Sequence, residues 1–139
     1  MSALYRLLVT AHVAANLVWI GAILSVGMIL ASKSGEVRAG APFAYELYRK
    51  LAVPAFVVSF VAAVARVSMS AQLYFVETTY MHPKLLFALI VIVLHHIIGA
   101  RAKAVATGRR SSPGPVGMLS MLLLVSAVAA TIFVVVKPF

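Results

Sequence analysis

The chain has 139 residues, of which 63% are hydrophobic and 11% charged, and its mean hydropathy is +1.06. Soluble domains carry about 25% charged residues, so this composition excludes a soluble globular domain. The net charge is +9, but Lys and Arg also collect in the cytoplasmic loops of membrane proteins, and no basic stripe is interleaved with aromatic residues, so we expect no nucleic-acid partner.

Four long apolar runs follow one another along the chain. A helix needs roughly 20 apolar residues to cross a bilayer, so these runs predict an all-α membrane protein, a four-transmembrane-helix bundle that forms a single domain over residues 1–139. Pro54 lies inside the second run and is expected to kink it. The predicted helices cover about residues 4–31, 43–71, 80–104 and 118–136, with loops at 32–42 and 107–117.

The residue types that carry much of enzyme chemistry are scarce. The chain contains no cysteine, which excludes thiolate zinc sites, iron–sulfur clusters and covalent C-x-x-C-H haem. It contains no aspartate, and its acids are Glu36, Glu46 and Glu77. Reactions that need paired carboxylates, such as glycoside cleavage or two-metal hydrolysis, therefore lack their residues.

The distribution of Lys and Arg predicts an orientation. Eight of the twelve basic residues lie on the side of the first and third connections: Lys33, Arg38, Arg49, Lys50, Arg101, Lys103, Arg109 and Arg110. Cytoplasmic loops carry an excess of Lys and Arg, so both connections are expected in the cytoplasm and both termini outside. In a bacterial inner (plasma) membrane this orientation makes the termini of the multi-pass protein periplasmic.

His12 is the most informative single residue, because it lies inside an apolar helix. Ionisable groups at such positions usually face the bundle interior, and a neutral imidazole is a good ligand for iron, copper or zinc. A structural role is the alternative, in which His12 hydrogen-bonds Asn16 or a neighbouring carbonyl. The sequence leaves both interpretations open.

His82 is the preferred partner of His12 for a metal or haem iron. If the helices are untilted, the two histidines differ in depth by roughly 7 Å, whereas His12 and His95 differ by about 12 Å. His95 and His96 are adjacent and point about 100° apart, so one of them is expected to face the bundle. They remain alternative second ligands.

Positive charge is predicted at the same depth as these histidines. Arg66, Lys84 and Lys137 would attract the carboxylates of a haem or another tetrapyrrole. The alternative is that their side chains reach the lipid headgroups, which accounts for Lys137 better than for Arg66 and Lys84. Trp19, in the middle of the first helix, is either a packing residue, which we favour, or a cofactor contact.

Several motifs resemble those of one family. They are, in chain order, His12-x6-Trp19-x-Gly21, Leu47-Tyr48-Arg49 followed by Pro54, YMHPKLLFALIVIVLHHIIG at residues 80–99, and the closing VVVKPF. This order, over nearly the whole chain, resembles the HemJ-type protoporphyrinogen oxidases, small bacterial four-helix membrane proteins related to the copper-resistance D domain. The chain departs from the family in having Tyr80 instead of Trp, and SVGMIL at 25–30 instead of a segment with Pro-Arg.

The resemblance implies a haem-b protein that oxidises protoporphyrinogen IX to protoporphyrin IX and passes electrons onward, plausibly to quinone. The family's first-helix histidine corresponds to His12, and its H-x-K to His82 and Lys84. Its second-helix arginine corresponds to Arg49. The resemblance therefore implies metal ligation by His12 and His82 and catalytic roles for Lys84 and Arg49. Arg66, from its charge and depth, and Trp19 are the further expected cofactor contacts.

Two other functions stay open at this point. A copper-handling membrane protein would use histidines and Met69, Met81, Met118 and Met121, although no Met-x-x-Met array is present. A cofactor-free scaffold subunit would contact only membrane lipid and protein partners. A bundle of this size could also form a homo-oligomer, but no interface motif is distinct.

Overall fold

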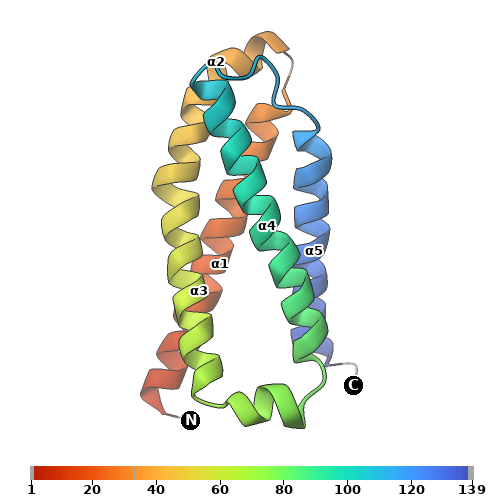
Figure 1. Cartoon of the computed structure of the whole chain (residues 1–139). Coiled ribbons are helices and arrows are strands. Elements are labelled where there is room, and N and C mark those ends of the chain that lie inside the picture. Colours follow the sequence, from red (N-terminus) through yellow and green to blue (C-terminus); the bar gives the residue numbers. More distant parts are fainter. Residues whose placement is uncertain (1, 33, 138–139) are drawn as a thin grey trace.

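The fold is an all-α bundle, as the sequence predicts. The computed structural model describes residues 2–32 and 34–137, and every regular element among them is helical. Figure 1 shows four long helical columns side by side, with both chain termini at the same end of the bundle. The elements are α1 (Ala3–Leu30), α2 (Ser34–Leu47), the π-helical turn η1 (Tyr48–Ala52), α3 (Val53–Ser68), the π-helical segment η2 (Leu73–Glu77), α4 (Met81–Ala106) and α5 (Val116–Val136).

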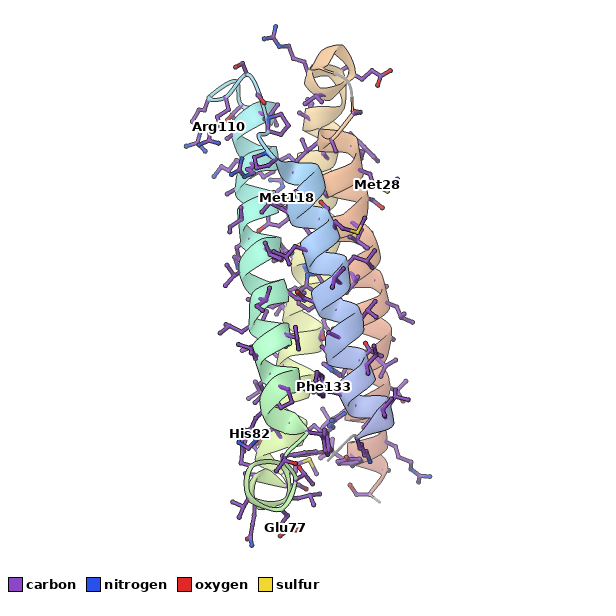
Figure 2. All side chains as sticks on the ribbon, turned by 90° about the vertical axis from the view of Figure 1, so that its right-hand side faces the viewer. Met28, Glu77, His82, Arg110, Met118 and Phe133 are labelled. Carbon is purple, nitrogen blue, oxygen red and sulfur yellow. The ribbon has the colours of Figure 1, made fainter. Side chains whose placement is uncertain are left out.

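Four continuous helical segments are long and apolar enough to cross a membrane. They are residues 3–30, 35–68, 81–106 and 116–136. Large apolar side chains cover the outside of the bundle, as Figure 2 shows, and Leu17 and Met28 are 74% and 73% exposed. An outward apolar surface of this kind is stable against lipid and unfavourable in water, so the chain is a multi-pass membrane protein.

The two ends of the bundle differ in what closes them. One end carries the termini and η2, which crosses below α3 and α4 in Figure 1; we call it the termini end. The other carries α2 and the connection between α4 and α5; we call it the α2 end. Lys33, used in the charge count, and Pro138-Phe139 of the closing motif lie outside the described residues.

The second membrane segment begins earlier than the sequence predicts. The predicted loop at 32–42 is mostly helical, because α2 starts at Ser34 and continues through Pro42. Ala41 and Ala44 of α2 are fully buried in the core, so this segment has tertiary contacts that a free loop lacks. Packing therefore extends the helix into a segment whose composition is that of a loop.

A π-helical turn joins α2 to α3. The N–H of Val53 donates to the carbonyl of Tyr48, five residues back, and Pro54 follows in the first turn of α3. Proline has no N–H, and its ring crowds the carbonyl four residues earlier, so the turn before it widens. The kink predicted from Pro54 corresponds to this local wide turn.

Small residues allow the helices to approach closely at two points. A Cβ on Gly27 of α1 would overlap the side chain of Ser120 of α5, and a Cβ on Gly99 of α4 would overlap the ring of Tyr48. Close contact at glycine and serine is typical of membrane helix packing, where lipid tails are as apolar as the side chains. The second contact positions Tyr48 beside His95.

Candidate functional site

His12 makes hydrogen bonds through both ring nitrogens. Its Nδ1 lies 3.0 Å from the carbonyl oxygen of Ser59 and 3.0 Å from the Ser59 hydroxyl, and its Nε2 lies 3.2 Å from the side-chain nitrogen of Asn16. The Ser59 hydroxyl donates to the Asn16 amide oxygen at 2.6 Å. Both hydrogen-bonding partners considered in the structural interpretation of His12, Asn16 and a carbonyl, are therefore present.

This network also fixes the proton of His12. The Asn16 amide nitrogen is a donor only, so Nε2 accepts and Nδ1 carries the proton that it donates to Ser59. Histidines that bind metals through one nitrogen usually donate the other N–H to a carbonyl or carboxylate. Nδ1 of His12 thus makes the contact that a metal-binding histidine would also make, while Asn16 occupies Nε2, the nitrogen that a metal would use.

Two cations share this region without an acidic partner. Arg66 and Lys84 lie close enough to act electrostatically on each other and on the His12 ring. Among residues 2–32 and 34–137 there are two ion pairs, and both involve Glu46, which lies near the α2 end and not in this region. The Nε of Arg66 is buried and has no hydrogen-bond partner. The structure thus brings His12, Arg66 and Lys84 together, as expected from the similar depths predicted for them.

A pair of tyrosines closes this region at the termini end. The hydroxyls of Tyr5 and Tyr74 lie 2.7 Å apart, and the Arg66 guanidinium carbon lies 5.4 Å from the centre of the Tyr74 ring. Tyr74 belongs to η2 and is only 3% exposed. Burial raises the pKa of Tyr74, and the hydrogen bond with Tyr5 acts in the same direction. The aromatic pair holds η2 across the end of the bundle.

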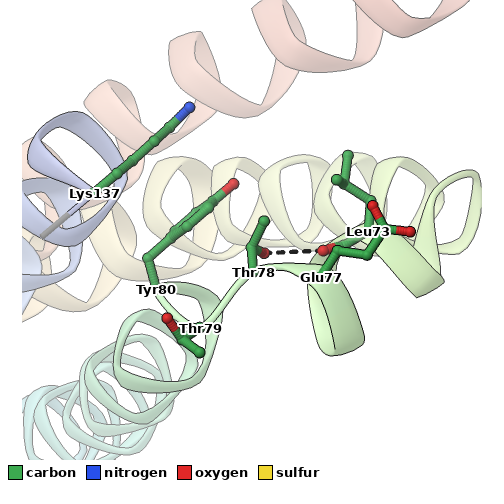
Figure 3. A pocket seen from close by; sticks show the side chains of 6 residues that line it. All are labelled: Leu73, Glu77, Thr78, Thr79, Tyr80 and Lys137. Carbon is green, nitrogen blue, oxygen red and sulfur yellow. Dashed lines mark hydrogen bonds between the residues drawn. The ribbon is translucent and has the colours of Figure 1, made fainter. Parts of the chain in front are cut away.

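A cavity of about 300 Å³ lies beside this pair. Figure 3 shows the Lys137 side chain passing over Tyr80, whose ring centre is 5.6 Å from the ammonium nitrogen. Thr78 donates to the carbonyl of Leu73 at 3.0 Å and so fixes the chain where η2 ends. Lys137 therefore packs on a ring at the bundle end. The lining residues are Leu73, Glu77, Thr78, Thr79, Tyr80 and Lys137.

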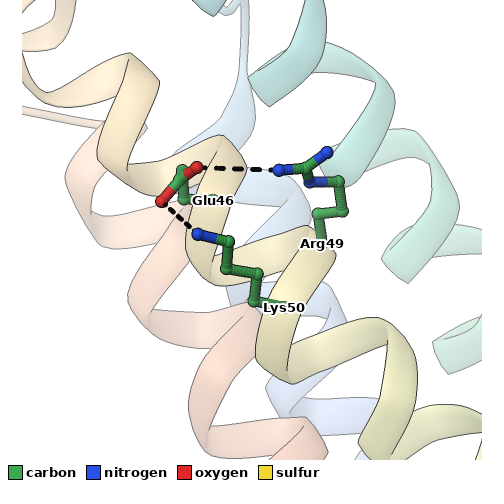
Figure 4. A network of polar contacts seen from close by, with 3 residues as sticks. All are labelled: Glu46, Arg49 and Lys50. Atoms are coloured by element: carbon green, nitrogen blue, oxygen red, sulfur yellow. Dashed lines mark hydrogen bonds and ion pairs between the residues drawn. The ribbon is translucent and has the colours of Figure 1, made fainter.

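His82 and Arg49 lie apart from this cluster. His82 is exposed, its Nδ1 is 3.4 Å from the carbonyl of Thr79, and its ring meets Phe75 edge-on at 6.4 Å; Figure 2 shows it at the margin of the bundle. Arg49 lies in η1 near the α2 end, 60% exposed, and pairs with Glu46 at 3.6 Å, as Figure 4 shows. Lys84, in the first turn of α4, lies toward the termini end.

A second polar centre lies in the core and involves Trp19. The indole N–H of Trp19 donates to Nδ1 of His95 at 3.0 Å, and its ring packs on Phe56 at 4.9 Å between centres. Both Trp19 and His95 are buried. Trp19 therefore serves packing and also orients a histidine, whereas His96, next to it, is exposed and lies 2.8 Å from the carbonyl of Ile92 through Nδ1.

Aromatic rings surround His95 on several sides. Its ring centre lies 5.0 Å from that of Tyr48, 5.2 Å from that of Phe56 and 5.6 Å from that of Trp19. The sequence predicts that one of His95 and His96 faces the bundle, and the structure gives His95 that position. Nothing in the sequence indicates its contact with Trp19, 76 residues away.

The described residues contain no group of three or more His, Cys, Asp or Glu side chains that could hold a metal ion. No family model, curated protein or solved structure matches the chain.

Proposed function

We propose that this chain is a membrane redox protein that binds haem b near the termini end of the bundle. The observation that carries the proposal is the group of His12, Arg66 and Lys84, in which two cations lie beside a correctly oriented imidazole without an acid to neutralise them. Half-buried cations without a partner are unfavourable, and the propionates of a haem would supply the missing negative charge.

Of the two expected haem ligands, His12 fits that role more clearly than His82. His12 has its Nδ1 proton bound to Ser59 and can offer Nε2 to iron once Asn16 moves aside. His82, the expected second ligand, is exposed and would have to turn from Thr79 toward the bundle. His12 is therefore the ligand on which the proposal depends, with His82 as the second and Trp19 as a neighbouring contact.

The activity proposed is oxidation of protoporphyrinogen IX to protoporphyrin IX, with electrons passed to an acceptor such as quinone. Bound haem b would supply the electron-transfer chemistry. Lys84, next to the proposed propionate site, is suited to hold a substrate carboxylate. Arg49 is paired with Glu46 at the α2 end, away from Lys84, and takes no part in the site proposed here.

The proposal includes a location and an orientation. The excess of Lys and Arg on the side of α2 and of the α4–α5 connection favours a cytoplasmic α2 end. The termini end, with the proposed haem, would then face the periplasm from a bacterial inner membrane.

The visible spectrum of the purified protein tests haem binding. Wild-type protein expressed with a haem precursor should show a Soret band, which His12→Ala should lose and His82→Ala should shift or lose. Lys84→Met should lower haem retention, while Lys50→Met, which removes a lysine from the distant Glu46 pair, should retain it. A wild-type Soret band that is unchanged in both histidine variants would overturn the proposal.

Activity is tested separately by complementing a bacterial strain that lacks its protoporphyrinogen oxidase. Growth with the wild type, and none with His12→Ala or Lys84→Met, is the expected result. A haem-containing protein that never complements would leave the cofactor assignment intact and refute the oxidase activity.

A further inference from the structure

His95 has a buried hydrogen-bond donor without an acceptor. Because the indole N–H of Trp19 can only donate, Nδ1 of His95 accepts, and the proton of this imidazole is on Nε2. The Nε2 atom is buried and has no partner, in a side chain that is 0% exposed. A buried N–H without an acceptor is unfavourable, most of all in the apolar interior of a membrane protein.

The surroundings of this donor are aromatic. Tyr48 and Phe56 lie at 39° and 35° to the His95 ring with centres 5.0 and 5.2 Å away, and Trp19 meets it edge-on. The ring of His96 also meets it edge-on, with centres 5.0 Å apart, and none of these four neighbours carries a permanent charge. Aromatic walls favour a flat ring by stacking and edge contacts. A molecule that satisfies the Nε2–H here needs a neutral acceptor on a flat apolar body.

The ring of Tyr48 fills a space into which the ring of a flat ligand would fit. Its ring lies over Gly99, where a Cβ would overlap it, one helical turn after His95 on α4. Tyr48 is half-buried rather than buried, and it is the first residue of the wide turn η1. Wide π-helical turns are frequent at functional sites. Rotation of Tyr48 outward would leave a ring-sized notch bounded by Gly99, His95 and Phe56.

We infer that His95, Phe56 and the Gly99 notch under Tyr48 form a binding site for a flat, membrane-soluble molecule with a ring carbonyl oxygen, which accepts the Nε2–H of His95. The site lies on α3 and α4, about one helical turn along the bundle from the contacts of His12, and does not depend on a bound tetrapyrrole. His95 is not a metal ligand in this arrangement, because Nδ1 is engaged by Trp19 and Nε2 carries the proton.

Trp19 provides a built-in reporter, because it is the only tryptophan in the chain and touches His95 directly. The probe is menadione, a flat apolar quinone that quenches indole fluorescence. The chain has no cysteine for it to alkylate. Menadione is titrated into the protein in lipid nanodiscs, prepared without haem precursor so that failure of the haem proposal cannot affect the result.

Wild type should show saturable quenching above the linear response caused by collisions in the bilayer. His95→Phe removes the donor at similar volume and should raise the half-saturation concentration about tenfold or abolish saturation. His96→Phe, on the neighbouring exposed residue, keeps an aromatic ring in edge contact with His95 and Phe56; it is the matched control and should bind like wild type. Tyr48→Ala opens the notch in advance and should lower the half-saturation concentration severalfold.

Linear quenching in every protein would overturn the inference. Equal saturation in wild type and His95→Phe would overturn it as well, by placing the quinone elsewhere. If His95→Phe does not fold by circular dichroism, Tyr48→Ala decides: tighter binding supports the site, and unchanged or weaker binding refutes it.

Discussion

The indole N–H of Trp19 donates to Nδ1 of His95 across 3.0 Å and links α1 to α4 in the middle of the core. Since tryptophan has a donor and no acceptor, this one contact determines which His95 nitrogen carries the proton. A single hydrogen bond thus distinguishes His95 from His12: Nε2 of His95 is a donor, and Nε2 of His12 is an acceptor. The half-buried His12 and the buried His95 are therefore suited to different ligands.

Removing the Trp19 donor should destabilise the bundle. We expect Trp19→Phe to lower the free energy of unfolding by about 1–3 kcal/mol, because Nδ1 of His95 loses its partner and the smaller ring leaves space. Unfolding by SDS in mixed micelles, followed by circular dichroism, measures the change. In a double-mutant cycle with His95→Phe, the interaction energy should be about 0.6–2 kcal/mol. Additive effects would show that the hydrogen bond contributes nothing.

The close contact between Gly99 and Tyr48 predicts a strong effect of one methyl group. Gly99→Ala should cost about 1–3 kcal/mol of unfolding free energy, because the added Cβ overlaps the Tyr48 ring. Addition of Tyr48→Ala should recover part of that loss. Gly21→Ala is the matched control, since nothing lies within 4 Å of its Cβ, and it should be neutral or stabilise the protein by up to about 1 kcal/mol. Equal effects at both glycines would contradict this packing.

Lys84 should affect stability and haem retention in opposite directions. In protein without haem, Lys84→Met removes the repulsion between two cations that have no acidic partner, and we expect a gain of about 1 kcal/mol. The same variant should hold haem less well. Thermal unfolding of haem-free protein in detergent, with Lys50→Met as the control, measures the gain. A Lys84→Met protein that is less stable than wild type would point to a purely structural role.

Tyr74 should make the protein sensitive to alkaline pH. Burial and the Tyr5 hydrogen bond raise the pKa of Tyr74 above its unfolded value, so the folded state retains a proton that the unfolded state loses. Stability from this group is complete below the unfolded pKa of about 10 and declines as the pH rises above it. Unfolding midpoints between pH 8 and 11 should fall less steeply in Tyr74→Phe than in wild type. Parallel curves would refute the assignment.

The sequence predicts the features that depend on composition and on local spacing. Four apolar runs define the four membrane segments. The spacing of His12 and Asn16, one helical turn apart, anticipates their hydrogen bond. The position of a residue along its helix gives its depth in the bilayer, and similar depths predict that His12, Arg66 and Lys84 lie near one another.

Other features depend on how the helices rotate about their axes, which depth does not specify. The partners Trp19 and His95, or Tyr48 and Gly99, are brought together only by packing between different helices. The early start of α2 has the same origin, because its buried alanines are stabilised by neighbours that local sequence does not reveal. The exposed position of His82 is a matter of how α4 is rotated about its axis. Its predicted depth, within roughly 7 Å of that of His12, does not specify this rotation.

The wide turn η1 has a consequence for tolerance to insertions and deletions. A π-helical turn holds one residue more than an α-helical turn, so deleting one residue between Tyr48 and Ala52 would convert it to an ordinary turn and leave the flanking helices in their present orientation. Deleting one residue between Ala44 and Tyr48 would instead turn everything before the deletion by about 100° relative to α3. Ala41 and Ala44 would leave the core and face lipid. We therefore expect related sequences to keep the spacing between α2 and Tyr48 constant, whereas η1 tolerates the loss of one residue and the α4–α5 connection varies in length.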